Sequence, residues 1–303
     1  MEQHVRTDLR GGLEPERRHN RLGRTLSPYL LGGPAVLWLV VFFLVPLVTM
    51  LSLSIQTCDS FTLACKLTWH FGEFPNVLSE FGGTFVRSLV YAGAATIVTL
   101  IVSFPVTYWI AFRAKRKNFF LLMLLVPFFV SFVIRTTAWQ FLLSDQGIVL
   151  GTLKDHHLLP ENFHILATGW AVVAGIAYNY LPFTALPLYV ALERIDGRLL
   201  EASHDLYANR RVAFTRVVLP LSIPGIFAAF LLTFVPASGD YVNAFILGGT
   251  NNLMIGNIIQ NKFLYLPDYP AASALSVILM VMMLVGIALY SRVLGSRTIE
   301  EYV

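Results

Sequence analysis

The chain has 303 residues, of which 56% are hydrophobic and 13% are charged, and its formal net charge is +4. The mean hydropathy is +0.65. Because soluble globular domains carry roughly 25% charged residues, this composition excludes an ordinary soluble enzyme and predicts an integral membrane protein in contact with lipid. The positive charge falls in several separate segments, so we expect no nucleic-acid partner.

Residues 1–28 form a predicted polar tail. Positive charges before an apolar run are also typical of a signal peptide. The run that follows, Leu30–Ile55, exceeds the ~7–15 apolar residues of such peptides, and no A-x-A-like cleavage site comes after it. We therefore expect this run to remain as the first transmembrane helix. The tail carries Arg6, Arg10, Arg17, Arg18, Arg21 and Arg24.

Six apolar stretches are long enough to cross a membrane. About 20 helical residues span a hydrocarbon core of ~30 Å, and backbone groups in lipid must bond within helices. Prolines inside the stretches, Pro127 among them, predict local kinks. The predicted fold is an all-α integral membrane bundle with six transmembrane helices: Leu30–Ile55, Phe85–Phe112, Phe119–Leu143, Leu166–Leu192, Ile223–Tyr241 and Ala272–Leu294.

The distribution of positive residues predicts the orientation. If the N-terminal tail is cytoplasmic, most of the 22 Lys and Arg residues fall on the cytoplasmic side, in the tail, in 113–117, in 194–216 and near the C-terminus. Lys66, Arg87, Lys154 and Lys262 then lie outside, and Arg135 lies in the third span. The positive-inside rule and the even number of spans place both termini in the cytoplasm.

This topology divides the chain into four parts. Residues 1–28 are the cytoplasmic tail, 29–83 the first helix with an external loop, 84–294 a five-helix core with a cytoplasmic loop at 193–216, and 295–303 a cytoplasmic C-terminal tail. Cys58 and Cys65 both fall in the external loop, where conditions are oxidising. A disulfide and two free thiols are both compatible with their spacing.

Motifs for nucleotide, metal or covalent chemistry are missing from the sequence. No G-x-x-x-x-G-K-[ST] phosphate loop occurs, so we expect the chain to draw its energy from another protein. His156, His157 and His164 lack a cysteine or a well-spaced carboxylate set, so they predict a solvated loop rather than a metal site. We expect no metal, no cofactor bound by this chain and no catalytic residue.

The longest predicted cytoplasmic loop contains a short amphipathic helix beginning near Leu199. Residues three and four apart are neighbours on a helix, so Leu199, Ala202, Ser203 and Leu206 share one small face. Glu201, His204 and Asp205 point elsewhere. Such a helix can seat in a groove of a partner protein or lie against lipid headgroups, and the residues alone leave both alternatives open.

The same segment resembles a known family. An E-A-A…G loop followed by a proline-bearing helix start is the hallmark of the inner-membrane permease subunits of binding-protein-dependent ABC importers. Ser203 replaces the usual second alanine, and Tyr207 replaces the usual glycine. Because glycine permits φ > 0 after a short helix, tyrosine adopts such a turn only at a cost in free energy. The matching residues are Glu201, Ala202, Asp205, Leu206, Ala208, Leu219, Pro220, Pro224 and Gly225.

The resemblance implies the type I (MetI-like) permease fold of ABC importers and a non-catalytic role in the bacterial inner membrane. The implied partners are an ATPase subunit dimer that holds ATP and magnesium, a second, PotC-like permease subunit and an extracytoplasmic solute-binding protein. Nucleotide-driven closure of the ATPase would switch the pore between inward and outward access. The implied ATPase-coupling residues are Glu201, Ala202, Ser203, Asp205, Leu206, Tyr207 and Ala208.

The resemblance extends over Phe85–Leu294 and is strongest to PotB-type permeases of spermidine/putrescine importers. It therefore implies import of a polyamine or a related cation, while relatives for opines and other small solutes share much of the pattern. The supporting stretches are Val126-Pro127-Phe128-Phe129, Arg135-Thr136-Thr137-Ala138-Trp139, Asp145-Gln146-Gly147, Leu181-Pro182-Phe183, Gly248-Gly249 and Ile255-Gly256-Asn257.

Polar residues inside the membrane are candidates for a substrate pathway, because they are costly unless they face the bundle interior or water. Carboxylates and aromatic faces suit a cationic polyamine. The alternatives are a structural Asp240–Arg135 pair, an interfacial aromatic belt and an interhelical bond from Asn179. The candidate residues are Asp240, Tyr241, Asn243, Trp139, Tyr178, Tyr180 and Arg135.

Two other functions compete with an ATP-driven importer. An ion-coupled secondary transporter needs a self-contained pathway, often with internal repeats and several intramembrane ionisable groups. The sequence shows no internal repeat and few such groups. A membrane structural or insertion factor that transports nothing is not excluded by hydropathy.

Overall fold

The computed structural model describes residues 32–58 and 65–299. The tail predicted for residues 1–28 lies outside this part of the chain. The structure forms two compact units, Met1–Thr49 and Met50–Val303, which we describe separately. The described part of the first unit is helical and belongs to the span Gly32–Leu53, which includes the π-helix η1 (Val40–Leu44) and ends in α2 (Val45–Leu53). Most of its side chains are exposed and apolar, as suits a helix that faces lipid.

A short hairpin follows this span in the second unit. Strand β1 (Gln56–Cys58) pairs antiparallel with β2 (Cys65–Leu67), and the register places Cys58 opposite Cys65. A disulfide joins the two cysteines. The structure therefore selects the disulfide over two free thiols.

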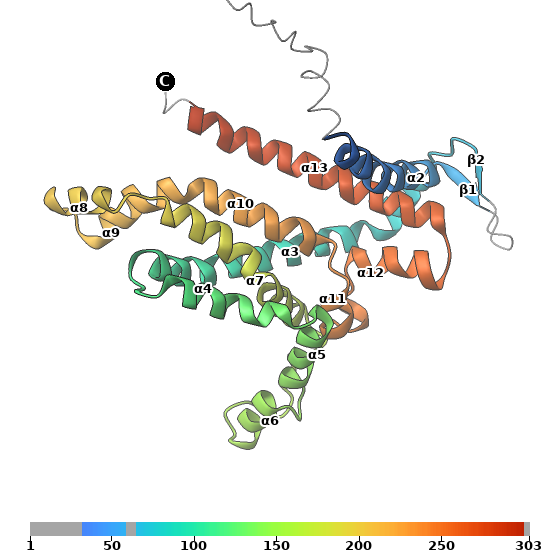
Figure 1. Cartoon of the computed structure of the whole chain (residues 1–303). Coiled ribbons are helices and arrows are strands. Elements are labelled where there is room, and N and C mark those ends of the chain that lie inside the picture. The colour runs from blue at the N-terminus through green and yellow to red at the C-terminus, as the bar shows by residue number, and fades with distance from the viewer. Residues whose placement is uncertain (1–31, 59–64, 300–303) are drawn as a thin grey trace, which may run out of the picture. The chain divides into compact units, whose positions relative to one another are not determined.

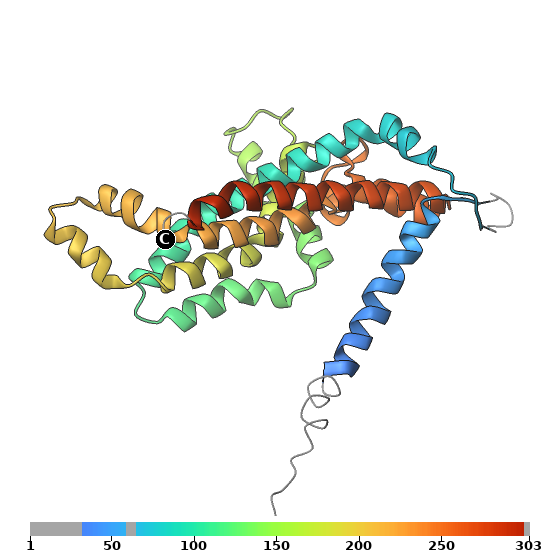
Figure 2. The ribbon, with the colours of Figure 1, turned by 90° about the horizontal axis from the view of Figure 1, so that it is seen from above.

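Four long helices form the bundle of the second unit. They are α3 (Glu73–Phe112), α7 (Gly169–Glu193), α10 (Leu219–Ser238) and α13 (Tyr269–Ile299). Helix α3 packs on α7, α10 and α13, and α7 packs on α10 (Figures 1 and 2). Small buried residues fill their contacts, which lets the backbones approach closely. Examples are Ala92, Ala95, Ala177 and Ala237.

The third predicted span differs from the expectation of one helix over Phe119–Leu143. Helix α4 (Lys117–Leu125) and the 3-10 turn η2 (Val126–Phe129) are followed by α5 (Phe132–Leu143) after a bend of 88°. Pro127 lies in η2, where it cannot donate a backbone hydrogen bond. Five helices of the described chain are long and apolar enough to cross a membrane, or up to six if the bent pair counts as one span.

Shorter elements connect the long helices. Helices α8 (Gly197–Asp205) and α9 (Arg210–Ala213) and the π-helix η3 (Phe214–Val218) join α7 to α10, at the left end of the bundle in Figure 1. Helix α6 (Ile148–Asp155) follows α5. Between α10 and α13 the chain forms α11 (Val242–Leu247), η4 (Thr250–Asn252), α12 (Ile255–Gln260) and η5 (Asn261–Tyr265).

Two boundaries differ from the sequence prediction. Helix α10 ends at Ser238, so Asp240 and Tyr241 lie in the break between α10 and α11 rather than inside the fifth span. Helix α13 continues to Ile299, so the C-terminal tail predicted for 295–303 begins as part of a helix.

Candidate functional site

The loop between α7 and α10 is a helical hairpin whose turns are capped by its own residues. The Arg198 backbone N–H donates to Asp196 Oδ1 at 3.0 Å at the start of α8. The Asn209 side chain caps α9 by accepting from the Val212 backbone N–H at 2.9 Å. Residues 210–238 then run as one helical segment into the membrane domain. The hairpin is therefore directly continuous with α10.

The hairpin is attached to the bundle by its apolar residues. Leu200 of α8 and Phe214 of η3 pack against a buried cluster that includes Ile110 of α3 and Leu192 of α7. The Phe214 ring also lies edge-on to Tyr108, with ring centroids 5.9 Å apart. Helix α8 is therefore packed, through Leu200, against a cluster formed by α3 and α7 and does not stand on a free loop.

The remaining face of α8 is exposed. Leu206 is 81% exposed and Tyr207 is 98% exposed, and Glu201, Ala202 and Asp205 also face outward. The predicted face of Leu199, Ala202, Ser203 and Leu206 therefore does not pack on this chain as a unit. Ser203 and Ala208 are half-buried.

Tyr207 has a backbone φ of 57°. The left-handed region costs an L-residue other than glycine roughly 1–2 kcal/mol. The structure thus places Tyr207 in the conformation for which glycine is the usual residue, at the position where the sequence departs from the family pattern.

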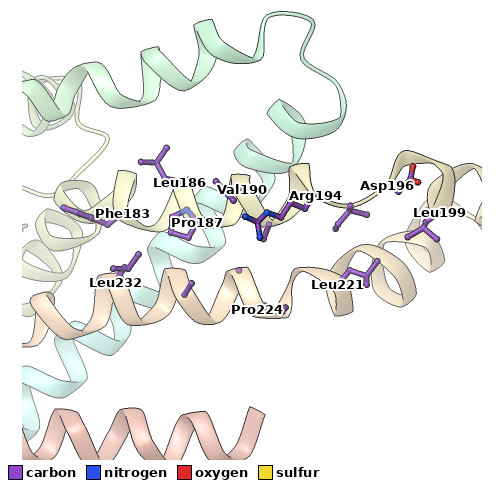
Figure 3. A pocket seen from close by; sticks show the side chains of 14 residues that line it. Phe183, Leu186, Pro187, Val190, Arg194, Asp196, Leu199, Leu221, Pro224 and Leu232 are labelled. Atoms are coloured by element: carbon purple, nitrogen blue, oxygen red, sulfur yellow. The ribbon is translucent and has the colours of Figure 1, made fainter. Parts of the chain in front are cut away.

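A hollow of about 800 Å³ extends along α7 and α10 up to α8 (Figure 3). Phe183, Pro187 and Val190 line it from α7, and Leu221 and Leu232 line it from α10. At the α8 end it reaches Arg194, Asp196 and Leu199. The walls are otherwise apolar, so this hollow offers two charged side chains only at one end.

The two helices meet at Gly225. A Cβ atom added there would lie 2.1 Å from the Cβ of Ala191 and 3.3 Å from the Pro187 carbonyl oxygen. This crossing has no room for any side chain at Gly225 in the described conformation. The contact fixes how closely α10 approaches α7.

A buried polar cluster joins α5, α7 and α11. Asn179 Nδ2 of α7 donates to Asn243 Oδ1 of α11 and to Thr136 Oγ1 of α5, each at 2.9 Å. The Thr136 hydroxyl lies 3.1 Å from Asn243 Oδ1. All three side chains have no exposed surface. Interhelical bonds between polar side chains are a recurrent means of joining membrane helices.

Asp240 extends this cluster at the break between α10 and α11. Its Oδ1 accepts from the Asn243 backbone N–H at 2.9 Å, and its Oδ2 accepts from Asn243 Nδ2 at 2.7 Å. The Tyr180 side chain lies beside the carboxylate. Asp240 is 5% exposed. The carboxylate therefore accepts a hydrogen bond from a backbone N–H in the first turn of α11, and it is buried in this conformation.

Arg135 is another of the predicted pathway residues, and it contacts aromatic rings. Arg135 is buried and its guanidinium lies over the rings of Phe128 and Phe132, at 5.0 and 5.8 Å from their centroids. Among the described residues it forms no ion pair with Asp240, so the predicted alternative of a structural Asp240–Arg135 pair is wrong.

The Trp139 and Tyr178 rings lie together between α5 and α7, with centroids 5.4 Å apart. Tyr241 is 45% exposed, and its carbonyl oxygen accepts from Asn257 Nδ2 at 2.7 Å. Its backbone therefore contacts α12 through Asn257. The structure thus brings Asp240, Asn243 and Tyr180 together and leaves Tyr241 apart.

Thr136 is a member of the cluster that the sequence did not single out. Serine and threonine in membrane helices commonly bond to their own backbone, so a lone threonine gives no signal of an interhelical contact. The pair of hydroxyls at Thr184 and Thr233, 2.6 Å apart between α7 and α10, escaped notice for the same reason.

His164, one of the histidines considered as metal ligands, lies beside a carboxylate that also contacts a lysine. His164 Nδ1 lies 2.7 Å from Asp145 Oδ2, and Lys154 Nζ lies 2.8 Å from Asp145 Oδ1. Within residues 32–58 and 65–299, no three His, Cys, Asp or Glu side chains are grouped so that they could hold a metal ion.

The sequence matches a family model along most of its length. The model described as "Binding-protein-dependent transport system inner membrane component" covers residues 77–296. The chain belongs to this family. The matched region includes most of α3, the coupling-loop candidate α8 and the polar cluster. A binding-protein-dependent inner membrane component is a permease rather than an enzyme, and the helical spans agree with that location.

Individual relatives are similar over nearly their full length. The spermidine/putrescine transport system permease protein PotB of Haemophilus influenzae is 36% identical over 264 residues, covering 84% of this chain and 90% of PotB. PotB of Escherichia coli K12 is 32% identical over 268 residues, covering 88% of this chain and 96% of PotB.

A solved structure shares the fold. It is a bacterial alginate ABC transporter in complex with an alginate pentasaccharide-bound periplasmic protein. One of its chains superposes with a TM-score of 0.70 at 18% identity, over 92% of this inner membrane component and 98% of that chain. The family match and this likeness together confirm the predicted permease bundle.

Proposed function

We propose that this inner membrane component is the permease subunit of an ATP-driven importer for a polyamine such as spermidine or putrescine. The observation that carries the proposal is the identity of 36% and 32% to two PotB permeases over more than four fifths of each chain. A separate ATPase dimer supplies the energy, a second permease subunit completes the pathway and an extracytoplasmic binding protein delivers the solute.

The proposed orientation places α8 and both termini in the cytoplasm. The positive residues of 113–117 and 194–216 support it, because they gather at the end of the bundle that carries α8. The disulfide-closed hairpin β1–β2 lies at the other end, which is the oxidising side in this orientation.

The proposed coupling step begins at α8. Its exposed residues Glu201, Asp205 and Leu206 supply charge and an apolar anchor for a groove on the ATPase. When the ATPase closes, α8 moves with it. Leu200 and Phe214 then carry the displacement to the helix ends packed beneath them. Because packed interfaces switch between discrete arrangements, the result is a change in how α7 and α10 pack, which opens one side of the pathway and closes the other.

The proposed pathway runs past the polar cluster of α5, α7 and α11. In the described conformation the cluster is closed, because Asp240 and Asn243 satisfy one another. Asn179 Oδ1 is buried and has no hydrogen-bond partner among the described residues. Separation of α5 or α11 from α7 would expose this amide oxygen and the Asp240 carboxylate. Both are acceptors for an ammonium group, and the Tyr180 ring beside them suits a cation.

The test is uptake and ATPase activity of the reconstituted importer with its loaded binding protein. Spermidine or putrescine should stimulate ATP hydrolysis and accumulate inside the vesicles, with uptake unaffected by a protonophore. Stimulation only by an opine or another small solute would refute the polyamine assignment. Uptake that needs an ion gradient and no ATPase would refute the importer class.

A matched pair of variants tests the coupling surface. Glu201→Ala removes one carboxylate from α8, and Leu206→Asp replaces the apolar anchor that follows α8 with a charged side chain. We expect loss of ATPase co-purification with the permease still folded. Leu158→Asp is the control, because Leu158 is also exposed, at 69%, but lies beyond α6. If the double variant binds the ATPase as well as Leu158→Asp and the native chain do, α8 is not the docking surface.

A further inference from the structure

Helix α8 ends in a motif that normally requires glycine. The Ala208 backbone N–H donates to the Ser203 carbonyl at 3.0 Å, and the Leu206 N–H donates to the Ala202 carbonyl at 3.2 Å. The first of these bonds is the six-to-one bond of a Schellman motif, which places Tyr207 at its left-handed position. The φ of 57° at Tyr207 is the conformation that the motif demands.

Packing of the Tyr207 side chain on the rest of the described chain does not offset the cost of its positive φ. Tyr207 is 98% exposed, so its ring is not packed on the bundle. Four non-glycine residues of the described chain have positive φ, and the side chain of Tyr207 is more exposed than that of Trp69, which is 65% exposed. Unfavourable backbone conformations persist mainly at functional sites, where another requirement maintains them.

The surroundings of the ring favour a protein partner over a lipid surface. Leu206, 81% exposed, stands beside it. Exposed charges of both signs flank the two residues, with Glu201 and Asp205 before them and Arg210 and Arg211 after them. An anionic membrane surface selects helices whose polar face is rich in Lys and Arg, whereas α8 carries Arg198 together with the two carboxylates Glu201 and Asp205. An aromatic and an aliphatic side chain inside a rim of mixed charge are instead the anatomy of a protein interface centre.

We propose that Tyr207 is the anchor residue that makes this permease selective for its own ATPase subunit, by inserting its ring, together with Leu206, into an apolar slot on that subunit. This inference rests on the proposed docking of α8 on the ATPase and adds to it the residue that decides the affinity. Tyrosine is suited to this role because it buries a large, rigid, amphipathic surface at the loss of only two side-chain torsions.

The experiment is a titration of the purified ATPase against the complete permease pair in lipid nanodiscs. Tyr207→Gly and Tyr207→Asn both tolerate positive φ and remove the ring, whereas Tyr207→Phe keeps the ring. We expect Tyr207→Gly and Tyr207→Asn to weaken ATPase binding at least about tenfold, as loss of an interface anchor does. Tyr207→Phe should remain within about threefold of the native chain.

A second readout separates an anchor from a merely structural residue. Relief of the positive φ should raise the thermal midpoint of the Tyr207→Gly permease without its ATPase, even though ATPase binding falls. The difference in affinity between this ATPase and one from another importer should also shrink in Tyr207→Gly.

Each contrary outcome has a defined meaning. If Tyr207→Gly binds the ATPase as tightly as the native chain, or if Tyr207→Phe loses as much as Tyr207→Gly, the ring is not the anchor and the inference falls. In that case the Glu201→Ala and Leu206→Asp double variant still decides the proposed function separately, because loss of binding there keeps α8 as the docking surface. Normal binding by the double variant as well would overturn both.

Discussion

Substitution of Gly225 by alanine should disturb the crossing of α7 and α10 more than its single methyl group suggests. The new Cβ would lie 2.1 Å from the Cβ of Ala191, far inside van der Waals contact. The Pro187 carbonyl is also only 3.3 Å away, so the two backbones must separate. Helix α10 is continuous with the helical loop that contains α8 and α9. Its separation from α7 should therefore affect both stability and transport.

Two opposing effects set the change in the free energy of unfolding that Gly225→Ala causes. Forcing a methyl group into a packed contact costs typically 1–3 kcal/mol. Alanine is preferred to glycine inside a helix by up to ~1 kcal/mol. We therefore expect Gly225→Ala to lower the free energy of unfolding by about 1–2 kcal/mol.

Gly93→Ala in α3 is the matched control. Its added Cβ would find only Phe234 Cε2 at 3.9 Å, an ordinary contact. The helix preference then acts alone, and we expect an unchanged or slightly increased stability, by up to ~1 kcal/mol. The assay is reversible unfolding of both variants in mixed micelles, followed by solute-stimulated ATPase activity after reconstitution.

Ala191→Gly provides an internal check on the mechanism. Removal of the Ala191 Cβ opens the space into which the new methyl group would go. Gly225→Ala should therefore cost less in the Ala191→Gly background than in the native chain, with a coupling energy of about 1 kcal/mol between neighbouring positions. The reasoning is refuted if Gly225→Ala is as stable as Gly93→Ala, or if the two changes at the crossing are additive.

Three further outcomes follow from the described contacts. Asn243→Ala removes the acceptor shared by Asn179 and Thr136 and should lower resistance to SDS unfolding by about 1–2 kcal/mol. Asp240→Asn keeps a residue that caps helices well, so the fold should persist, while polyamine uptake should fall at least about tenfold if the carboxylate meets the cation. Serine at both Cys58 and Cys65 should lower the local stability of the hairpin by about 2 kcal/mol, seen as faster amide exchange in β1–β2, without loss of uptake.

The sequence by itself determined the class of protein and the positions of its long apolar helices. Long apolar runs are required by the thickness of a bilayer, so hydropathy located α3, α7, α10 and α13 without reference to tertiary contacts. The amphipathic pattern after Leu199 predicted α8 for a similar local reason, since neighbours on one helix turn lie close in the sequence.

Tertiary structure alone decided which polar groups meet. Membrane helices such as α7 are apolar around most of their circumference, so the sequence does not reveal which side faces another helix. Asp240 consequently bonds to Asn243 rather than to Arg135, and Asn179 bonds across to Thr136. Helix rotation and axial position are set by packing with neighbours, not by local composition.

The same distinction explains the broken third span and the crossing at Gly225. Hydropathy over Phe119–Leu143 is continuous, and Pro127 predicted a kink but not its size. The structure shows a bend of 88°, after which α5 packs on α7 and α11. The sequence does not show which residue a helical glycine such as Gly225 contacts. The structure shows it, because a Cβ added at Gly225 would lie 2.1 Å from the Cβ of Ala191. Local patterns determine where helices form, and long-range contacts determine which of their faces touch.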